Sequence, residues 1–191
     1  MTCADLSSCQ LSGNLVQGAA DGAAVSVVQS SVLTMNGDQL LTSGFGISLT
    51  DGSSGHVYGA TVQGNSLGIQ VLGQGILVTD ATVSNNTGTG IFLTHNATLL
   101  CRGCQVIGNA VEGVIVRRDS SARFSGRFVV SGNTGAGVDL SENSSAFFAG
   151  TAGKIVQNVG GTDVMCGASF TTAKQATTNI GGGVTNCTEP K

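Results

Sequence analysis

A short phrase ending in asparagine recurs along most of the chain. An aliphatic residue stands three positions before each asparagine, and the asparagines follow one another at intervals of 21 to 29 residues. The seven asparagines are Asn14, Asn36, Asn65, Asn86, Asn109, Asn133 and Asn158. A repeat of this length holds a single supersecondary unit, which buries its apolar face only against neighbouring copies. The chain is therefore predicted to be a stack of similar units.

A second repeated phrase has the form glycine, aliphatic, variable, aliphatic. Its copies begin at Gly46, Gly68, Gly90, Gly113 and Gly137. The variable position holds Ser48, Gln70, Phe92, Ile115 and Asp139. Such alternation with a period of two is typical of a short strand with one buried face. A third in-out-in element precedes the asparagine, as in residues 97–99, and helical spacing of apolar residues is missing. Each repeat is therefore predicted to contain three short strands.

Three strands in a coil of about 22 residues describe a parallel β-helix, in which each coil hydrogen-bonds only to its neighbours. We predict an all-β fold, a single solenoid of about seven three-strand coils. The helix is expected over residues 11–165, after an N-terminal cap at 1–10 and before a C-terminal cap or tail at 166–191. The aliphatic residue of each phrase should stack inside the coils. The asparagine should adopt a left-handed backbone at a bend and bond to the asparagine one coil away.

The repeated phrases resemble those of a known family. The aliphatic-x-Gly-Asn, Gly-Ile-x-Val and Ser-Ser-Ala-x-Phe phrases, the last at 120–124 and 144–148, are similar to the right-handed parallel β-helix repeats of the pectin-lyase-like superfamily. The resemblance runs from about residue 11 to residue 158 and implies a right-handed coil. That superfamily includes polysaccharide lyases and hydrolases, epimerases, phage tailspikes and adhesins, so the fold implies no single activity. Its lyases use clustered acidic residues for calcium, and no three acidic residues stack here. No catalytic residue, metal site or cofactor is therefore carried over.

The charged residues of successive coils fall into register at one turn. Aligning the strands on their glycines stacks His95, Arg118 and Glu142, and the six candidate glycan-binding residues around this turn are His95, Arg117, Arg118, Asp119, Asp139 and Glu142. An arginine there can contact a sugar carboxylate while the acidic residues accept hydroxyls. The alternative is a charge ladder that neutralises itself on a solvated turn. We favour this second interpretation.

The same turn is the place where a carbohydrate-active enzyme would have its site. A lyase or hydrolase near His95, Arg118, Asp139 and Glu142 is the alternative function. A glycosidase needs two carboxyl groups flanking the scissile bond, with one of them held protonated. The sequence does not mark either Asp139 or Glu142 as such an acid. Catalysis is therefore the less favoured hypothesis.

Apolar residues also occur at outward strand positions. Phe92 and Ile115 occupy neighbouring coils and are predicted to form a small interaction patch. Phe147 should point outward on another face, beside Arg123. Aromatic side chains on a flat sheet stack against sugar rings or pack against a partner. Scattered exposed apolar residues are also common in proteins without such a site.

The cysteines and the charge balance restrict compartment and partners. Six cysteines in 191 residues favour an oxidising compartment, and the candidate disulfide residues are Cys3, Cys9, Cys101, Cys104, Cys166 and Cys187. Cys3 with Cys9 and Cys166 with Cys187 would join the ends of the chain, and Cys101 with Cys104 would form a structural disulfide or remain two thiols. The single Cys-x-x-Cys does not supply the four ligands of structural zinc. A net charge of −3 argues against nucleic acid as a partner, and no apolar stretch is long enough to span a membrane.

These observations favour a structural or interaction module over an enzyme. The expected location is extracellular, at a cell surface or in a periplasm. The expected partners are a polysaccharide or surface glycan, or a second copy of the chain through self-association.

Overall fold

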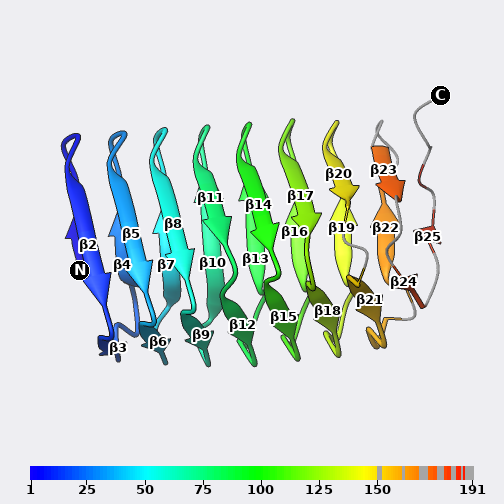
Figure 1. Ribbon diagram of the computed structural model, residues 1–191, viewed down its shortest axis with the longest axis horizontal. Coiled ribbons are helices and arrows are strands. Elements are labelled where there is room, and N and C mark those ends of the chain that lie inside the picture. Colours follow the sequence, from blue (N-terminus) through cyan, green and yellow to red (C-terminus); the bar gives the residue numbers. More distant parts are fainter. Residues whose placement is uncertain are drawn as a thin grey trace.

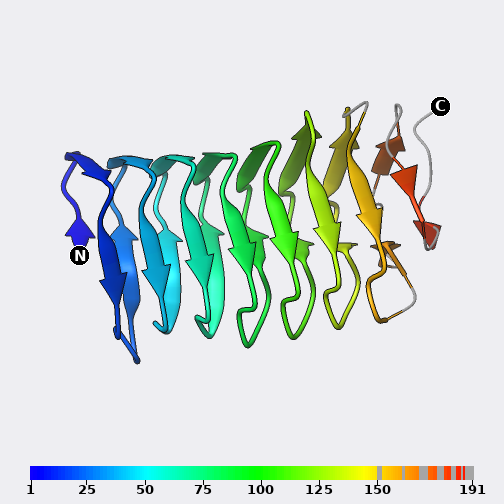
Figure 2. The same ribbon diagram turned by 60° about the horizontal axis from the view of Figure 1, so that its bottom comes forward.

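A computed structural model describes residues 1–149, 152–160, 162–167, 172–175, 179–181, 184–185 and 187. The described residues form strands and turns with no helix, and the strands lie in three parallel sheets. Figures 1 and 2 show the coils following one another along the long axis in sequence order, with β1 at one end and β25 at the other. Each coil contributes one strand to each sheet, so every strand pairs with the strands three places before and after it in sequence. The predicted solenoid of three-strand coils is confirmed.

The first sheet contains the Gly-aliphatic-x-aliphatic strands. In order along the solenoid its described strands are β1 (Thr2–Cys3), β4 (Ala23–Val27), β7 (Phe45–Leu49), β10 (Leu67–Leu72), β13 (Ile91–Thr94), β16 (Val114–Val116), β19 (Val138–Leu140), β22 (Val164–Cys166) and β25 (Val184–Thr185). Ile69, Ile91, Val114 and Val138 are Cα partners in this sheet and are fully buried. The aliphatic residues therefore point to a common axis, as the alternation predicts.

The second sheet follows the first within each coil. Its strands are β2 (Ser8–Ser12), β5 (Val32–Asn36), β8 (Ser54–Tyr58), β11 (Ile76–Thr79), β14 (Thr98–Arg102), β17 (Ser121–Ser125), β20 (Ser145–Phe148) and β23 (Thr172–Gln175). The turn that joins a first-sheet strand to a second-sheet strand is called the first corner, and it comprises residues 50–53, 73–75, 95–97, 117–120 and 141–144 in the central coils.

The third sheet completes the coil with mostly three-residue strands. These strands are β3 (Leu15–Gln17), β6 (Gln39–Leu41), β9 (Thr61–Gln63), β12 (Thr82–Ser84), β15 (Gln105–Ile107), β18 (Val129–Ser131), β21 (Lys154–Val156) and β24 (Asn179–Ile180). A second corner lies between the second and third sheets. A third corner returns the chain to the first sheet, at residues 64–66, 85–90, 108–113 and 132–137 in the central coils.

A ladder of buried asparagines runs through the third corner. Its members are Asn65, Asn86, Asn109, Asn133 and Asn158. The side-chain amide of each of the first four donates to the amide oxygen of the next asparagine, at 2.9 to 3.1 Å. The amide of Asn158, the last member, donates to Asp163 Oδ1 at 2.8 Å. Each amide also donates to a third-sheet carbonyl of the preceding coil, such as that of Val83 for Asn109. Because buried amides are costly without partners, this ladder fixes the register of neighbouring coils.

The ladder differs from the sequence prediction in its backbone. The left-handed backbone falls on the residue before each ladder asparagine, with φ between 51° and 67°, at Gly64, Asn85, Gly108, Gly132 and Gln157. The asparagine itself is then free to turn its amide into the corner. This geometry explains the recurring Gly-Asn pair, since glycine adopts positive φ without strain.

Two asparagines of the sequence repeat lie elsewhere. Asn36 ends β5 and is exposed, and Asn14 lies at the second corner, so neither belongs to the ladder. Ser43 takes the ladder position instead, its backbone N–H donating to the amide oxygen of Asn65. Leu11 and Leu33 accordingly lie in the second sheet, apart from the row formed by Val62 and its successors. Ten residues separate Asn36 from Gly46, against three or four between asparagine and glycine in the later coils, and this spacing alone predicts a long bulge. That prediction is wrong, because the segment contains strand β6.

The glycine of each Gly-aliphatic-x-aliphatic strand makes room for the ladder. A methyl group on Gly90 would lie 2.6 Å from the carbonyl oxygen of Gly113 and 2.8 Å from the side-chain nitrogen of Asn109. Gly68 and Gly113 meet the same kinds of neighbour. The sequence phrase is thus a packing requirement at a close approach of two coils.

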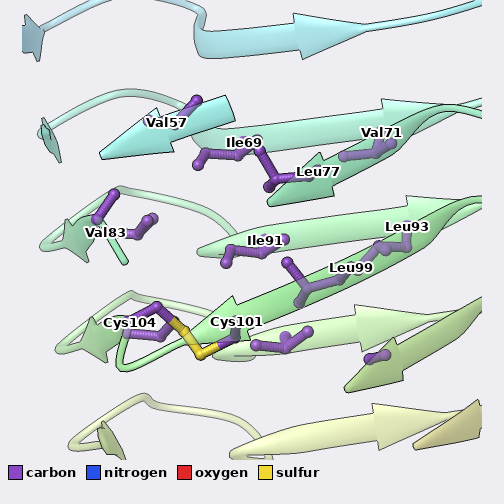
Figure 3. Packing of buried hydrophobic residues seen from close by; sticks show 14 of the residues in the cluster. Val57, Ile69, Val71, Leu77, Val83, Ile91, Leu93, Leu99, Cys101 and Cys104 are labelled. Atoms are coloured by element: carbon purple, nitrogen blue, oxygen red, sulfur yellow. A yellow bond between two sulfur atoms is a disulfide. The ribbon is translucent and has the colours of Figure 1, made fainter. Parts of the chain in front are cut away.

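The inward column of the second sheet becomes aromatic in the later coils. It runs through Met35, Val57, Thr79, Cys101, Phe124 and Phe148, so small side chains precede two phenylalanines. The Cys101–Cys104 disulfide lies between the small and the aromatic layers, and both cysteines are fully buried. Figure 3 shows this disulfide packed in the same interior as Leu99, Ile91 and Val83. The disulfide is therefore part of the core packing.

The other two predicted disulfides lie near the ends. Cys3 is bonded to Cys9 and Cys166 to Cys187. The first of these bonds lies within residues 1–10, the predicted N-terminal cap, where β1 and β2 already pair with β4 and β5. The predicted C-terminal cap or tail at 166–191 lies partly outside the described residues. Its described strands β23, β24 and β25 continue the three sheets.

Candidate functional site

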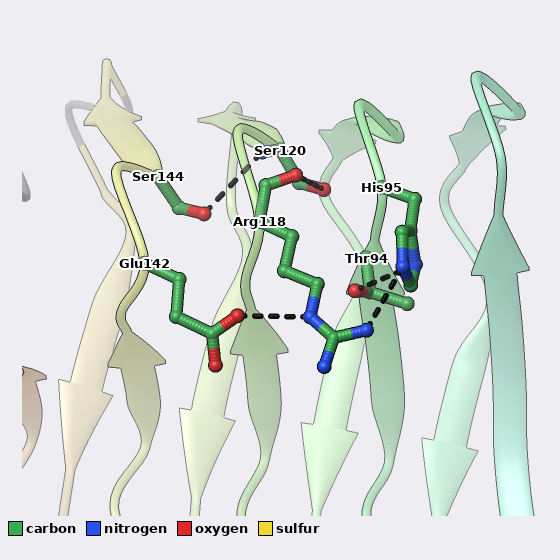
Figure 4. A network of polar contacts seen from close by, with 6 residues as sticks. All are labelled: Thr94, His95, Arg118, Ser120, Glu142 and Ser144. Atoms are coloured by element: carbon green, nitrogen blue, oxygen red, sulfur yellow. Dashed lines mark hydrogen bonds and ion pairs between the residues drawn. The ribbon is translucent and has the colours of Figure 1, made fainter.

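The stacked charges at the first corner lie where the sequence places them. His95, Arg118 and Glu142 follow one another in successive coils, linked by backbone bonds such as Asn96 N–H to Arg118 carbonyl at 3.0 Å. All three have positive φ, between 51° and 60°, at an exposed turn. Figure 4 shows their side chains aligned across three coils.

These three side chains bond to one another. Arg118 Nε donates to Glu142 Oε2 at 3.0 Å, and Arg118 Nη1 lies 2.8 Å from His95 Nε2. Since guanidinium only donates, His95 Nε2 accepts, and its Nδ1–H donates to Thr94 Oγ1 at 3.1 Å. Arg118 thus uses its Nε and Nη1 groups for contacts within the protein.

A short serine ladder holds the corner beneath them. The backbone N–H of Ala97 donates to Ser120 Oγ at 3.1 Å, and that of Ser120 donates to Ser144 Oγ at 3.3 Å. Ser120 and Ser144 are buried, and Figure 4 shows them on the same turns, above Arg118 and Glu142 in this view. The charges are therefore displayed on a rigid turn.

The remaining charged candidates are also paired. Arg117 Nη2 lies 3.0 Å from Asp139 Oδ2, and Asp139 is 4% exposed on the outer face of β19. Asp119 accepts a hydrogen bond from the side-chain amide of Asn143. Asp139 and Glu142 are thus bonded to two different arginines. This pairing favours the charge-ladder interpretation, and a glycan-binding role for these residues stays a prediction.

The outward patch on the first sheet is smaller than its sequence indicates. Phe92 and Ile115 are Cα partners on neighbouring strands, and Phe92 is half-buried. Ile115 is only 6% exposed, with Asp139 as its partner on the other side. An outward apolar residue is covered here by its neighbours on the sheet. Most of the remaining contact area belongs to Phe92.

A hollow of about 400 Å³ lies on the outer face of the second sheet, across β14, β17 and β20. Its lining residues are Thr98, Leu99, Leu100, Ser121, Ala122, Arg123, Ser145, Ala146 and Phe147. The register makes the hollow a short groove along the solenoid axis. One wall is a hydroxyl row, Thr98, Ser121 and Ser145, and the other wall is the row Leu100, Arg123 and Phe147.

The two walls have different chemistry. Thr98 Oγ1 and Ser121 Oγ lie 3.5 Å apart, so the hydroxyl row presents donors and acceptors at successive coils. On the opposite wall the Arg123 guanidinium carbon lies 5.0 Å from the centroid of the Phe147 ring. A cation in this position is attracted to the ring face, which orders both side chains. The predicted outward direction of Phe147 beside Arg123 is confirmed.

The hollow itself is missing from the sequence interpretation. Its hydroxyl row comes from the Ser-Ser-Ala-x-Phe phrase, whose second serine points outward while its alanine points inward. The alternation of inward and outward residues is enough to predict that Ser121 and Ser145 point outward. What the sequence does not show is the space that these small side chains leave beside Arg123.

The described part of the chain contains no cluster of three or more His, Cys, Asp or Glu side chains suited to holding a metal ion. Within the same residues, no helix has the length and apolar character needed to cross a membrane.

Stacked coils, three parallel sheets and an interior asparagine ladder together define a parallel β-solenoid. The chain belongs to the right-handed β-helix family, since the family model described as "Right handed beta helix region" matches residues 3–129 and 68–177. The resemblance to the repeats of the pectin-lyase-like superfamily agrees with this match. Searches of curated proteins and of solved structures gave no match.

Proposed function

We propose that this protein is an interaction module of an oxidising compartment, outside the cell, at its surface or in a periplasm, and that it binds a glycan. The glycan would lie in the hollow on β14, β17 and β20. The observation that carries the proposal is the pairing of an aromatic and aliphatic wall with a hydroxyl wall across one groove. Sugar rings have apolar C–H faces and hydroxyl edges, so they complement such a groove.

The cysteines support the proposed compartment. Three disulfides account for all six cysteines, and two of the bonds have a partner that is half-buried rather than buried. Disulfides persist in oxidising compartments and are uncommon in a reducing cytosol. The module is therefore best suited to a setting in which extracellular or surface glycans are present.

A rigid scaffold supports binding at this place. The hollow spans three consecutive strands whose Cα register is regular, and its floor is formed by the buried residues Leu99, Ala122 and Ala146. Little ordering of the backbone is needed before a ligand is bound, and a preorganised site loses less affinity to ordering. The volume of the hollow, about 400 Å³, is within the range of small-molecule sites.

The charged first corner supports catalysis less well. Asp139 and Glu142 each bond to an arginine, so neither carboxyl group is free to face a scissile bond. A lyase or hydrolase at this corner would first have to break both ion pairs.

A glycan array tests the proposal. The wild-type protein should bind a subset of immobilised glycans, and Phe147→Ala should lower the signal on those glycans about tenfold. That estimate follows from an aromatic contact of roughly 1.4 kcal/mol, which corresponds to a factor of ten. Phe92→Ala tests the competing surface, the outward patch on the first sheet. If the glycan lies in the hollow, this variant should bind as the wild type does.

Two results would count against this function. One is the absence of binding to every glycan on the array. The other is binding that Phe147→Ala and Phe92→Ala weaken equally. If the protein instead associates with itself as concentration rises in sedimentation experiments, and retains no glycan, the structural role replaces the glycan-binding role.

A further inference from the structure

Four exposed basic residues lie in the three coils that form the hollow. They are Arg102 at the end of β14, Arg123 in β17, Arg127 at the second corner after β17, and Lys154 at the start of β21. These residues are called the basic edge. The chain as a whole carries a net charge of −3, so this grouping runs against its overall composition.

Neighbouring coils bring the basic edge together. A methyl group on Gly126, next to Arg127, would lie 3.8 Å from the carbonyl carbon of Arg102, so the two arginines sit on adjacent backbone segments. Arg102 and Ser125 are Cα partners, and Arg123 lies two residues before Ser125 in the same strand. Lys154 pairs with Val129, two residues after Arg127. The four residues thus span three consecutive coils along the hollow.

Among the described residues, no carboxylate forms an ion pair with the basic edge. The ion pairs of that part of the chain are Arg117 with Asp139 and Arg118 with Glu142, both at or next to the first corner. Asp80 directly follows β11, the strand that pairs with β14, but its carboxylate accepts a hydrogen bond from the backbone N–H of Gly59 at 2.6 Å, in the preceding coil. The guanidinium groups of Arg102 and Arg127 keep their donors for another partner.

We infer that the ligand of the hollow is an anionic glycan, whose carboxylate or sulfate groups are bound by the basic edge. This inference rests on the proposed function, which supplies the sugar-binding groove. Guanidinium groups bind carboxylate and sulfate oxygens through paired N–H donors, and a bound anion replaces the missing internal carboxylates. Arg123 belongs to both features, because it lines the groove and stands at the basic edge.

A glycan fits this surface better than a nucleic acid does. The basic edge is four side chains wide on an acidic protein, and phosphate-backbone binding draws on a broader basic face. Bases also need several aromatic platforms, and the hollow has the single ring of Phe147. The groove wall of hydroxyls matches a sugar edge instead.

Three polymers with one backbone test the charge requirement. Plain dextran, carboxymethyl dextran and dextran sulfate differ in their charged groups, and the wild-type protein should bind the charged forms at least tenfold more tightly than plain dextran. The two charged forms distinguish carboxylate from sulfate as the preferred group. Raising the salt concentration from 50 to 500 mM should weaken the binding, because exposed charges are screened.

Charge variants assign the binding to this face. Arg102→Gln and Arg127→Gln should each lower the affinity for the charged polymers about tenfold, the equivalent of one charge-assisted hydrogen bond. Arg118→Gln tests the competing surface, because Arg118 belongs to the candidate glycan-binding residues at the first corner. If the ligand lies on the basic edge, this variant binds as the wild type does. Circular dichroism should show that all three variants keep the β spectrum, since their side chains are exposed.

The outcomes separate this inference from the proposed function. Equal binding of charged and plain polymers, or an equal loss in Arg102→Gln and Arg118→Gln, would overturn the inference. Glycan binding that depends on Phe147 but favours neutral glycans would overturn it as well, while the proposed function would stand. Tighter binding of duplex DNA than of any glycan would instead assign the basic edge to nucleic acid.

Discussion

The side-chain amide of Asn86 donates to the amide oxygen of Asn109 at 2.9 Å, and the same oxygen accepts the backbone N–H of Asn86 at 3.1 Å. Asn109 repeats both bonds with Asn133 in the next coil. One amide oxygen thus joins two coils by two hydrogen bonds in a buried corner. The solenoid gains register from these bonds, because a shift by one residue would leave the buried amides without partners.

Asn109→Ala should therefore destabilise the fold strongly. The substitution removes the acceptor for Asn86 and both donor bonds of Asn109, to Asn133 and to the carbonyl of Val83. Buried groups left without partners each cost roughly 1 to 3 kcal/mol, so we expect a loss of about 3 kcal/mol in the free energy of unfolding. Urea denaturation followed by circular dichroism measures it.

Asn36→Ala is the control for this variant. Asn36 is exposed at the end of β5, and its change should alter the free energy of unfolding by less than about 0.5 kcal/mol, as expected for surface positions. Equal losses in the two variants would mean that the ladder position has no special weight.

Gly90→Ala should be destabilising for a steric reason. Its new methyl group would lie 2.6 Å from the carbonyl oxygen of Gly113 and 2.7 Å from Val106 Cγ1, and the backbone oxygen cannot move without parting the two coils. We expect a loss of about 3 kcal/mol, typical of an overpacked core. Gly22→Ala is the control, since its methyl group would have no neighbour within 4 Å. Thermal unfolding of both proteins checks the difference, and a normal melting temperature for Gly90→Ala would contradict it.

The three disulfides should differ in their rates of reduction under native conditions. Cys101 and Cys104 are both fully buried, whereas Cys9 and Cys187 are half-buried. Thiol–disulfide exchange requires access of the attacking thiolate to a sulfur atom. With dithiothreitol and alkylation followed by mass spectrometry, Cys3–Cys9 and Cys166–Cys187 should be reduced first. If Cys101–Cys104 is reduced as fast as they are, the central coils open more readily than their packing indicates.

The sequence predicts the central coils better than the first two. Between Gly46 and Gly137 the repeat length is nearly constant, so aligning the glycines places His95, Arg118 and Glu142 in the correct register. In the early coils Ser43 replaces the ladder asparagine, and an aliphatic-x-x-Asn phrase occurs by coincidence at the end of β5. The repeat pattern therefore assigns Asn36 to the third corner, although Asn36 ends β5 and lies just before the second corner.

Asp38 shows the kind of residue that such a mismatch conceals. It is fully buried at the second corner, where its carboxylate accepts hydrogen bonds from the backbone and side-chain N–H groups of Asn14 and from the backbone of Asn36. A period-based alignment interprets it as part of a surface bulge. Its buried position can be recognised only if the residues of the second corner are aligned separately from those of the third corner. In that alignment Ala60 occupies the same position in the next coil.

The hollow depends on the volumes of facing side chains rather than on a motif. Alternation predicts that Ser121, Arg123, Ser145 and Phe147 point outward, which is correct. The space between the two rows arises because the hydroxyl wall is short while the opposite wall is long. No single strand carries that information, since it belongs to three strands in register.

Truncation of two adjacent phenylalanines should affect different properties, stability for Phe148 and glycan binding for Phe147. Phe148 is fully buried, with its ring centroid 5.1 Å from that of Phe124 and 6.3 Å from that of Phe128. Phe148→Ala should cost about 3 to 5 kcal/mol in the free energy of unfolding, because it leaves a cavity in the aromatic part of the core. Phe147 points outward into the hollow, so Phe147→Ala should cost less than about 1 kcal/mol while weakening glycan binding. Parallel urea denaturation and array binding of the two variants measure both effects. A destabilisation of Phe147→Ala as large as that of Phe148→Ala would contradict the outward assignment and would make its binding loss uninformative about the hollow.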